Sequence, residues 1–418
     1  MAQALQASPA AGLADRPVSE LAAQTAPELA PARQVEGLSL VFADGQSAGR
    51  LLDGNASTKL TLAAGATLRL TAPAGQAMAG LYLIWDRPVE PWRLTTESGR
   101  QIWGNHGYLH EYAEIPGGAA WAEIQAPAAG GVLCDIYAFG AGSLPDWVQV
   151  WRPPHRRADI LLLPTHSDDE HLFFGGTMPY YAGELGRKVQ VAYLTHHWAE
   201  PYRPHELLNG LWTVGIRHYP VIGEFPDYYS DSLAHARTLY DRERMVEYQI
   251  GLLRRFRPLV VIGHDINGEY GHGVHRLNTD TLRQALEMSG DPAAAPDLAR
   301  RYGVWDVPKT YLHLYPENNM LMDWDRPLAR FDGATAFEMA EKGFACHVSQ
   351  GRWFSVRRAG VHDCRSFGLY RSDRGPDLNG GDFMEGLAPY ADGGTVRSVT
   401  LPRYGSTRYG LDMVWSIF

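Results

Sequence analysis

Two histidines and three carboxylates fall within six residues, 166–171, of the segment PTHSDDEHLFFGGT. Histidine and carboxylate side chains are the usual protein ligands of catalytic zinc, which keeps one position for water. His166 and Asp169 are three residues apart, so a turn that leaves a strand can bring both onto one ion. The alternative is a capping turn in which Ser167 or Asp168 begins a helix. Gly175 and Gly176 would let the backbone pass close to a metal or a substrate.

A second pair of histidines, His272 and His275, lies in the segment YGHGVH after a later apolar run. This segment can supply the third ligand. Asp168 beside Asp169 allows the two carboxylates different tasks, because one can bind the ion while the other takes a proton from water. The ion lowers the pKa of that water towards about 7, which makes a carboxylate a sufficient base. Together the two segments predict a metal site with a catalytic base.

Both segments follow predicted strands in a region that alternates apolar runs with helical patterns. The runs are ADILLLPTH, KVQVAYLTHH, RHYPVIG, PLVVIGHD and KTYLHLY, and the helical patterns cover residues 178–185, 204–214, 232–256 and 277–288. Such alternation predicts an α/β fold with a parallel sheet covered by helices on both faces. Ligands bind at the carboxyl ends of such strands. The polar residues that follow the runs, among them His196, His197, Asp227 and His264, are expected to gather there.

Residues 35–143 have a different pattern, with short alternating runs separated by Gly, Asn and Pro turns. This pattern predicts a β-sandwich, which could bind carbohydrate. Four aromatic residues lie near its predicted turns, where they could stack on sugar rings or pack in the core: Trp85, Trp92, Trp103 and Tyr108.

The remaining boundaries follow from composition. Residues 1–34 are rich in Ala and Pro and are expected to form a disordered tail. Residues 144–347 form the predicted catalytic domain, and residues 348–418 a C-terminal extension packed on it. The tail has neither a basic nor an apolar region of a signal peptide. We expect an exported or extracellular bacterial protein without its signal peptide, with a cytoplasmic protein as the alternative.

The bulk composition excludes several classes of partner. The chain of 418 residues has a net charge of -9, which gives no attraction to nucleic acid. No apolar run is long enough for a transmembrane segment. The three cysteines show no CxxC spacing, so a thiolate metal site is not predicted, although Cys346 and Cys364 could pair.

At these motifs the sequence resembles the PIG-L/LmbE-like family of zinc-dependent deacetylases, which hydrolyse the acetamide of N-acetylglucosamine-type sugars. The family motif A-H-P-D-D-E stands here as THSDDE, and G-x-x-G-H-P-D-H is matched in part by EYGHGVH. Two weaker matches lie between them, RPHE with its following glycines and FPD. The resemblance covers about residues 158–315 and implies a Rossmann-like sheet.

The resemblance also implies a role for each matched residue. The metal ligands of a Zn²⁺ ion would be His166, Asp169 and His275; the general base Asp168; the groups facing the substrate carbonyl His272 and Tyr270; and the contacts to sugar hydroxyls Arg203 and Asp227. For Arg203, a salt bridge with Glu200 or Glu206 is the alternative. Ser167 replaces the family proline, and Gly273 with Val274 replaces Pro-Asp, which bears on the protonation of His272.

The expected function is therefore the zinc-dependent removal of an N-acetyl group from an N-acetylated amino sugar, in a glycan or glycoconjugate. Two alternatives stay open. The altered HGVH motif is compatible with a catalytically silent sugar-binding protein on the same scaffold. The same site could also hydrolyse a non-sugar amide.

Overall fold

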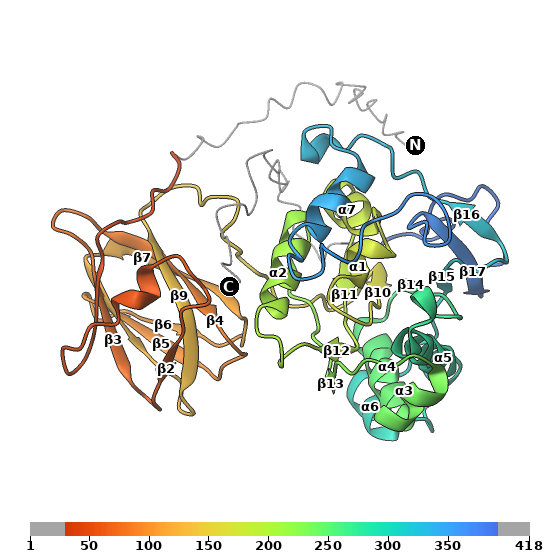
Figure 1. The fold of residues 1–418 in the computed structure, drawn as a ribbon, viewed down its shortest axis with the longest axis horizontal. Helices are drawn as coiled ribbons and strands as arrows, with labels where there is room; N and C mark the ends of the chain where they lie inside the picture. Colours follow the sequence, from red (N-terminus) through yellow and green to blue (C-terminus); the bar gives the residue numbers. More distant parts are fainter. Residues whose placement is uncertain (1–29, 392–418) are drawn as a thin grey trace, which may run out of the picture.

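A computed structural model of the chain describes residues 30–391, which form an all-β region and an α/β region side by side (Figure 1). Residues 1–29 and 392–418 lie outside the described residues, and with them most of the predicted tail. Pro31 and Gln34 already form β-bridges, with Ser143 and Phe139. Within residues 30–391, no helix is long and apolar enough to cross a membrane.

The all-β region consists of two antiparallel sheets. One has the order β1 (Ser39–Phe42), β3 (Thr67–Thr71), β8 (Trp121–Gln125), β5 (Trp92–Thr96) and β6 (Gln101–Gly104). The other has the order β2 (Leu60–Leu62), β9 (Gly131–Phe139), β4 (Met78–Trp85) and β7 (His110–Ala119), and the short helix η2 (Gly49–Leu52) packs against β9. Alternate residues of both sheets share one apolar core, which makes the region a β-sandwich.

The aromatic residues of the sandwich mostly serve packing. Trp85 and Trp92 are buried in its core, and Tyr108 is buried against the α/β region, where it stacks on Tyr219. Trp103, on edge strand β6, is 56% exposed. Of the four aromatic residues near predicted turns, Trp103 is therefore the one available to a ligand.

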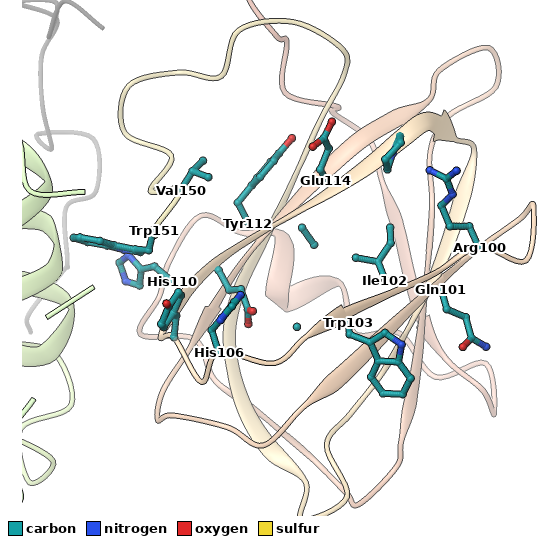
Figure 2. A pocket seen from close by; sticks show the side chains of 15 residues that line it. Arg100, Gln101, Ile102, Trp103, His106, His110, Tyr112, Glu114, Val150 and Trp151 are labelled. Carbon is teal, nitrogen blue, oxygen red and sulfur yellow. The ribbon is translucent and has the colours of Figure 1, made fainter. Parts of the chain in front are cut away.

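A groove of about 570 Å³ lies beside the edge strands β6 and β7, one from each sheet (Figure 2). Besides Trp103 and Tyr112, its lining includes the polar side chains of Arg100, Gln101 and Glu114. Its volume is within the usual range of small-molecule sites.

The α/β region is built on a sheet with the order β11 (Val189–Val191), β10 (Ile160–Leu162), β14 (Val260–Gly263), β15 (Lys309–His313), β17 (Ser366–Ser372) and β16 (Asn319–Leu321). The first four strands are parallel, and β17 is antiparallel to both of its neighbours. The sheet is therefore mixed, because the C-terminal extension contributes β17. The run RHYPVIG forms only isolated bridges, at His218 and Val221, and is not a strand of this sheet.

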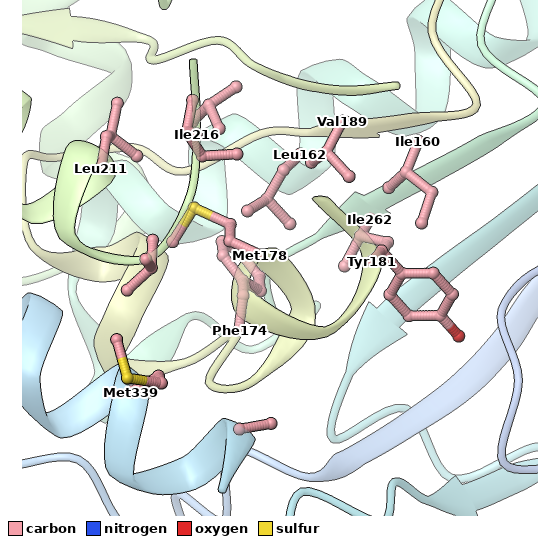
Figure 3. Close-up of a cluster of buried hydrophobic side chains, with 14 of the residues drawn as sticks. Ile160, Leu162, Phe174, Met178, Tyr181, Val189, Leu211, Ile216, Ile262 and Met339 are labelled. Carbon is pink, nitrogen blue, oxygen red and sulfur yellow. The ribbon is translucent and has the colours of Figure 1, made fainter. Parts of the chain in front are cut away.

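Helical layers cover both faces of the sheet, as the alternation along β10 shows. Ile160 and Leu162 point into one apolar layer, with residues of η3 (Met178–Glu184), α2 (Arg203–Thr213) and α7 (Ala336–Phe344) (Figure 3). Leu161 points into the other layer, with residues of α4 (Arg242–Phe256) and α5 (Gly273–Met288). The central strands are therefore apolar on both sides, as continuous runs predict.

The predicted single helix over residues 232–256 is in fact two helices, α3 (Leu233–Leu239) and α4. Tyr240 between them has extended backbone, and the Asp241 side chain caps α4 by accepting the N–H groups of Glu243 and Arg244. A capping aspartate interrupts the apolar periodicity without removing it, so the sequence pattern alone reads as continuous.

The smaller elements complete the α/β region. They are α1 (Asp169–Leu172), the two-stranded ladder of β12 (Thr195–His196) and β13 (Phe225–Pro226), η4 (Glu269–Gly271), α6 (Pro296–Tyr302) and η5 (Ala329–Phe331). Gly175 and Gly176, between α1 and η3, do not approach the predicted metal ligands. A Cβ on Gly175 would collide with Cys364, and a Cβ on Gly176 with Trp324, so these glycines permit close packing of the segments that carry Cys364 and Trp324.

A buried polar network joins the two regions. Nδ1 of His110 on β7 lies 2.8 Å from Oε1 of Gln149, which lies between β9 and β10. Nε2 of His110 lies 2.8 Å from Nδ1 of His205 on α2. Because the amide oxygen of Gln149 only accepts, His110 donates from Nδ1 and accepts from His205 at Nε2. Nε2 of Gln149 in turn donates a hydrogen bond to Oδ1 of Asn209 on α2, at 2.7 Å.

This network predicts a loss of stability in acid. Burial, followed by the influence of His110's neighbour His205, lowers the pKa of His110 well below its ordinary value. Burial, followed by Lys59 and Arg87, lowers the pKa of His205 to about 3. The unfolded chain takes up a proton on each histidine near pH 6.5, whereas the folded chain does not. The free energy of unfolding therefore keeps its full value above about pH 6.5. At lower pH it decreases by about 1.4 kcal/mol per pH unit for each histidine.

We predict that His205→Gln loses less stability than the wild type between pH 6.5 and 4.5, by up to about 2.7 kcal/mol. Urea unfolding at both pH values measures the difference. His235→Gln, at an exposed position on α3, is the matched control. Equal pH dependence in wild type and His205→Gln would contradict the prediction.

Candidate active site

Three of the predicted ligand side chains meet beyond the carboxyl ends of β10 and β14. Nδ1 of His166 lies 2.9 Å from Nε2 of His275, which lies 3.0 Å from Oδ2 of Asp169. The third side of the triangle, from His166 Nδ1 to Asp169 Oδ2, is 3.3 Å. The three side chains are buried. The structure therefore brings the predicted ligand set together.

The partners of the outer ring nitrogens of His166 and His275 indicate which nitrogen of each ring carries the proton. Nδ1 of His275 faces the carbonyl oxygen of Glu269 at 3.4 Å, and Nε2 of His166 faces a carboxylate oxygen of Asp227 at 3.3 Å. Each of these oxygens only accepts, so the protons of the neutral imidazoles lie on those nitrogens. The nitrogens that face Asp169 are then unprotonated.

These three groups fit a divalent metal ion. Two imidazole lone pairs and a carboxylate oxygen converge on one point, and such a set of acceptors is stabilised by a cation. Ligands about 2.1 Å from a tetrahedral ion lie about 3.4 Å apart, a few tenths of an ångström more than the separations here. His272 is adjacent, since one of its ring nitrogens lies within 4.8 Å of ligand atoms of His166 and His275.

The position of Asp169 is set by the backbone that precedes it. Its Oδ2 accepts the N–H groups of Thr165 and His166, at 3.1 and 2.7 Å, immediately after the end of β10. Although burial alone would raise the pKa of Asp169, its neighbours His275, His166 and His264 hold it well below the usual range. Asp169 is therefore ionised and available as a ligand.

A buried chain of polar groups supports Asp169 from behind. Nε2 of His264, at the end of β14, accepts the N–H of Thr165 at 3.0 Å, and its Nδ1 lies 3.3 Å from Glu269. The same oxygen of Glu269 lies 2.8 Å from Nδ1 of His313, at the end of β15. Nε2 of His264 also lies 3.4 Å from Oδ2 of Asp169, and Asp169, His264 and His275 form a second group of possible metal ligands. Sequence reasoning missed Glu269 and His313, although the position of His313 at a strand end was a signal.

Asp168, the predicted base, precedes Asp169 in an unusual conformation. Its φ angle is 128°, a backbone conformation that residues other than glycine rarely adopt. The N–H of Asp168 donates to Oε2 of Glu170 at 2.8 Å, and its carboxylate lies 3.6 Å from the guanidinium of Arg203. Burial, together with the charge of Asp169, raises the pKa of Asp168 well above its ordinary value.

Tyr270 and His272 border the ligands on the solvent side. Tyr270 is 47% exposed, and its ring centroid lies 5.4 Å from that of His275. Partial desolvation and the charges of Asp169 and Asp168 raise the pKa of the Tyr270 hydroxyl, which therefore stays protonated. Burial, followed by His166 and His275, lowers the pKa of His272 to about 3. Both groups are thus neutral at pH 7.

Arg203 and Asp227 lie beside the ligands and make contacts within the protein. The guanidinium of Arg203 donates to the carbonyl of Ser167 at 2.6 Å and lies 3.4 Å from Glu200 and 3.5 Å from Asp227. The salt bridge with Glu200, left open by the sequence, is thus present. The side chain of Asp227 is 26% exposed. The predicted contacts of both residues with sugar hydroxyls stay predictions.

Comparison with known proteins places this site in a family. The family model described as PIG-L, GlcNAc-PI de-N-acetylase, matches residues 161–286. A 1D-myo-inositol 2-acetamido-2-deoxy-alpha-D-glucopyranoside deacetylase 2 of Saccharopolyspora erythraea is 32% identical over 256 residues, which are 54% of this chain and 87% of that protein. This chain belongs to the PIG-L family.

Two further known proteins match smaller shares of this chain. A 1D-myo-inositol 2-acetamido-2-deoxy-alpha-D-glucopyranoside deacetylase 1 of Catenulispora acidiphila is 30% identical over 186 residues, and the chain spans only 56% of its length. The solved structure of an N,N'-diacetylchitobiose deacetylase from Pyrococcus horikoshii has 19% identity and a TM-score of 0.37, covering 47% of this chain and 72% of that chain.

The structure explains why serine can stand where the PIG-L motif has proline. The N–H of Ser167, which a proline would lack, donates to Nε2 of His197 at 3.0 Å. Nδ1 of His197 lies 3.2 Å from Asp227. Ser167 thereby connects the metal-binding turn through His197 to the carboxylate that faces His166.

The second departure from the PIG-L motif also has a local cause. A Cβ on Gly273 would lie 2.2 Å from the carbonyl oxygen of Ser232, so the loop before α3 packs where a proline ring would be. Val274 is fully buried and packs against Leu194 and Phe225 in an apolar cluster. The position therefore supplies no carboxylate to His272.

The cysteines take no part in this site. Cys134, Cys346 and Cys364 are all free, so the disulfide that the sequence left open, between Cys346 and Cys364, is not formed.

We predict that His275→Ala removes one equivalent of bound divalent metal per chain. Loss of groups that merely orient a ligand costs about 10- to 100-fold in affinity, so loss of a ligand should cost more. Metal analysis of protein passed over a chelating resin measures the content. His235→Ala, an exposed histidine on α3, should keep the full content. Unchanged metal content in His275→Ala would exclude His275 as a ligand.

Proposed function

We propose that this chain is a zinc-dependent hydrolase that removes the N-acetyl group from an N-acetylated amino sugar of the GlcNAc type. The observation that carries the proposal is the convergence of ring nitrogens of His166 and His275 on the Asp169 carboxylate, with Asp168 beside them. Membership of the PIG-L family supports the reaction class. The 2-acetamido sugar named for the relatives supports the substrate class.

The chain's own residues can divide the chemistry among them. Zn²⁺ held by His166, Asp169 and His275 would polarise the acetamide carbonyl and lower the pKa of the attacking water. Asp168 would take the proton of that water as it attacks the amide carbon. Arg203, 3.6 Å from Asp168, keeps the base oriented and balances part of the charge of the paired carboxylates.

Tyr270 and His272 would stabilise the negative charge that develops on the carbonyl oxygen. Both are neutral, so each has one proton to donate, and both rings lie close to that of the ligand His275. Donors already in place for a developing oxyanion contribute several kcal/mol of transition-state stabilisation in comparable sites, about 2.7 to 4 per donor. The lowered pKa of His272 favours Asp168, rather than His272, as the group that passes a proton to the leaving amine.

Exposed aromatic rings beside the site suit a sugar ring as the substrate. Tyr229 is 74% exposed, and its ring centroid lies 5.3 Å from that of His272. The ring centroid of Tyr270 lies 5.9 Å from that of His272. Aromatic faces stack on the apolar faces of pyranose rings. Asp227 and Arg203 would then contact hydroxyl groups of the same sugar.

We predict that Asp168→Asn lowers kcat for acetate release about 100- to 10,000-fold while the bound metal is retained, because amide cannot accept the water proton. Enzymatic determination of acetate from N-acetylglucosamine oligosaccharides gives the rate, and metal analysis gives the content. Treatment with a chelator should abolish the activity of the wild type, and added Zn²⁺ should restore it. Asp297→Asn, at an exposed position on α6, is the control.

The same assay separates the alternative functions. A panel of N-acetylated sugars and N-acyl amino acids distinguishes an amino-sugar deacetylase from a deacylase of non-sugar amides. If no member of the panel releases acid while sugars still bind, the chain is a sugar-binding protein on a PIG-L scaffold. Full activity in Asp168→Asn would exclude Asp168 as the base.

We further propose that the groove on the sandwich binds a carbohydrate chain. Trp103 offers an exposed ring, and Arg100, Gln101 and Glu114 offer polar groups around it (Figure 2). An aromatic face with a few polar side chains is the composition that sugar recognition needs. A glycan held there would keep its N-acetyl groups near the α/β region.

We predict that Trp103→Ala weakens binding of glycan oligosaccharides about 10-fold or more, since stacking on a ring of this kind contributes about 1 to 2 kcal/mol. Isothermal titration with a glycan panel measures affinity. Hydrolysis of a monosaccharide substrate should stay unchanged. Trp121→Ala, a partly exposed tryptophan on β8 outside the groove, serves as the matched control. Equal affinity of Trp103→Ala and wild type would contradict this role.

A further inference from the structure

A second cluster of metal-ligating side chains lies behind the active-site turn. Glu170 and His171 belong to α1, and His347 follows α7, which packs against α1 (Figure 1). All three side chains are completely buried. None of them contributes to the ligand set or to the proposed mechanism.

The three side chains converge on one point. Oε1 of Glu170 lies 3.0 Å from Nε2 of His347 and 3.4 Å from Nε2 of His171. One ligand atom from each residue lies within 4.8 Å of the other two. A carboxylate with two imidazoles is a donor set that zinc uses.

Three of the four histidine nitrogens have no hydrogen-bond partner within the described residues. Neither Nδ1 nor Nε2 of His171 has a hydrogen-bond partner within the described residues, and Nδ1 of His347 also has none there. A neutral imidazole carries one donor and one acceptor, and leaving both without a partner in a dry interior is costly. An ion bound to Nε2 of His171 would satisfy its acceptor.

Two glycines let the surrounding helices pack closely against these histidine rings. A Cβ on Gly210 of α2 would lie 2.7 Å from Nε2 of His171 and 3.1 Å from Nε2 of His347. A Cβ on Gly343 of α7 would lie 2.3 Å from a ring carbon of His171. Both Nε2 atoms therefore lie close to Gly210, where a residue with a side chain would collide with them.

We propose that Glu170, His171 and His347 bind a second divalent transition-metal ion, Zn²⁺ by its preference for this donor set. Its role would be structural. Oε2 of Glu170 accepts the N–H of Asp168, whose φ of 128° is unfavourable, so an ion on Oε1 fixes the carboxylate that holds this turn. It also joins α1 to the segment after α7. The proposal does not depend on the deacetylase activity.

Metal analysis and crystallography on the full-length wild type test the proposal directly. We expect two equivalents of zinc per chain after passage over a chelating resin. An anomalous difference map at the zinc edge should show one peak among His166, Asp169 and His275 and another among Glu170, His171 and His347. A peak at the first set alone, with one equivalent in solution, would overturn the proposal.

Variants separate the two sites. His347→Leu should retain one equivalent, at the active-site set, whereas His347→Cys should keep two because a thiolate also binds zinc. His275→Ala should lose the other equivalent and keep the ion at the second site. Two equivalents in a folded His347→Leu would also overturn the proposal. Should His347→Leu not fold, the anomalous map of the wild type still decides, and failure of the active-site ion alone would count against the proposed function only.

Discussion

The active site depends on the carboxylate of Asp169. Its Oδ2 accepts two backbone N–H groups at the end of β10, and the same carboxylate faces both ligand histidines. One histidine precedes it by three residues, and the other comes from α5, more than a hundred residues later. Two parallel strands end at the same edge of the sheet, and Asp169 closes the gap between the loops that follow them. If that carboxylate moved, the nitrogens of His166 and His275 would face each other with no counter-charge.

Much of this arrangement could be predicted from the sequence, because it depends on local signals. The apolar runs identified β10, β11, β14 and β15, and the rule that ligands bind at strand ends predicted that His166, Asp169 and a histidine of YGHGVH lie close together. The resemblance to the family then selected His275. The alternation of residues 35–143 likewise indicated antiparallel sheets. In each case a periodicity of two residues, or a short motif, carries the information within one segment.

The rest depends on contacts between distant segments, which no local pattern contains. The carboxylate of Asp227, which the resemblance places in contact with the substrate, also lies against His166, His197 and Arg203, and no local pattern indicates these contacts. Strand β17 enters the sheet from the C-terminal extension, whose composition resembles that of a loop. The break between α3 and α4 needs one capping aspartate that the apolar period conceals.

The departures from the PIG-L motifs become intelligible when each is considered with its partner. A serine N–H at position 167 is useful only because His197 accepts from it, and His197 in turn pairs with Asp227. Gly273 is needed because the backbone at Ser232 occupies the space of a larger residue. In both places the departing residue fits its own local contacts, and His166, Asp169 and His275 still converge. The alteration of HGVH therefore changes what surrounds His272, and it leaves the nitrogen of His275 facing Asp169.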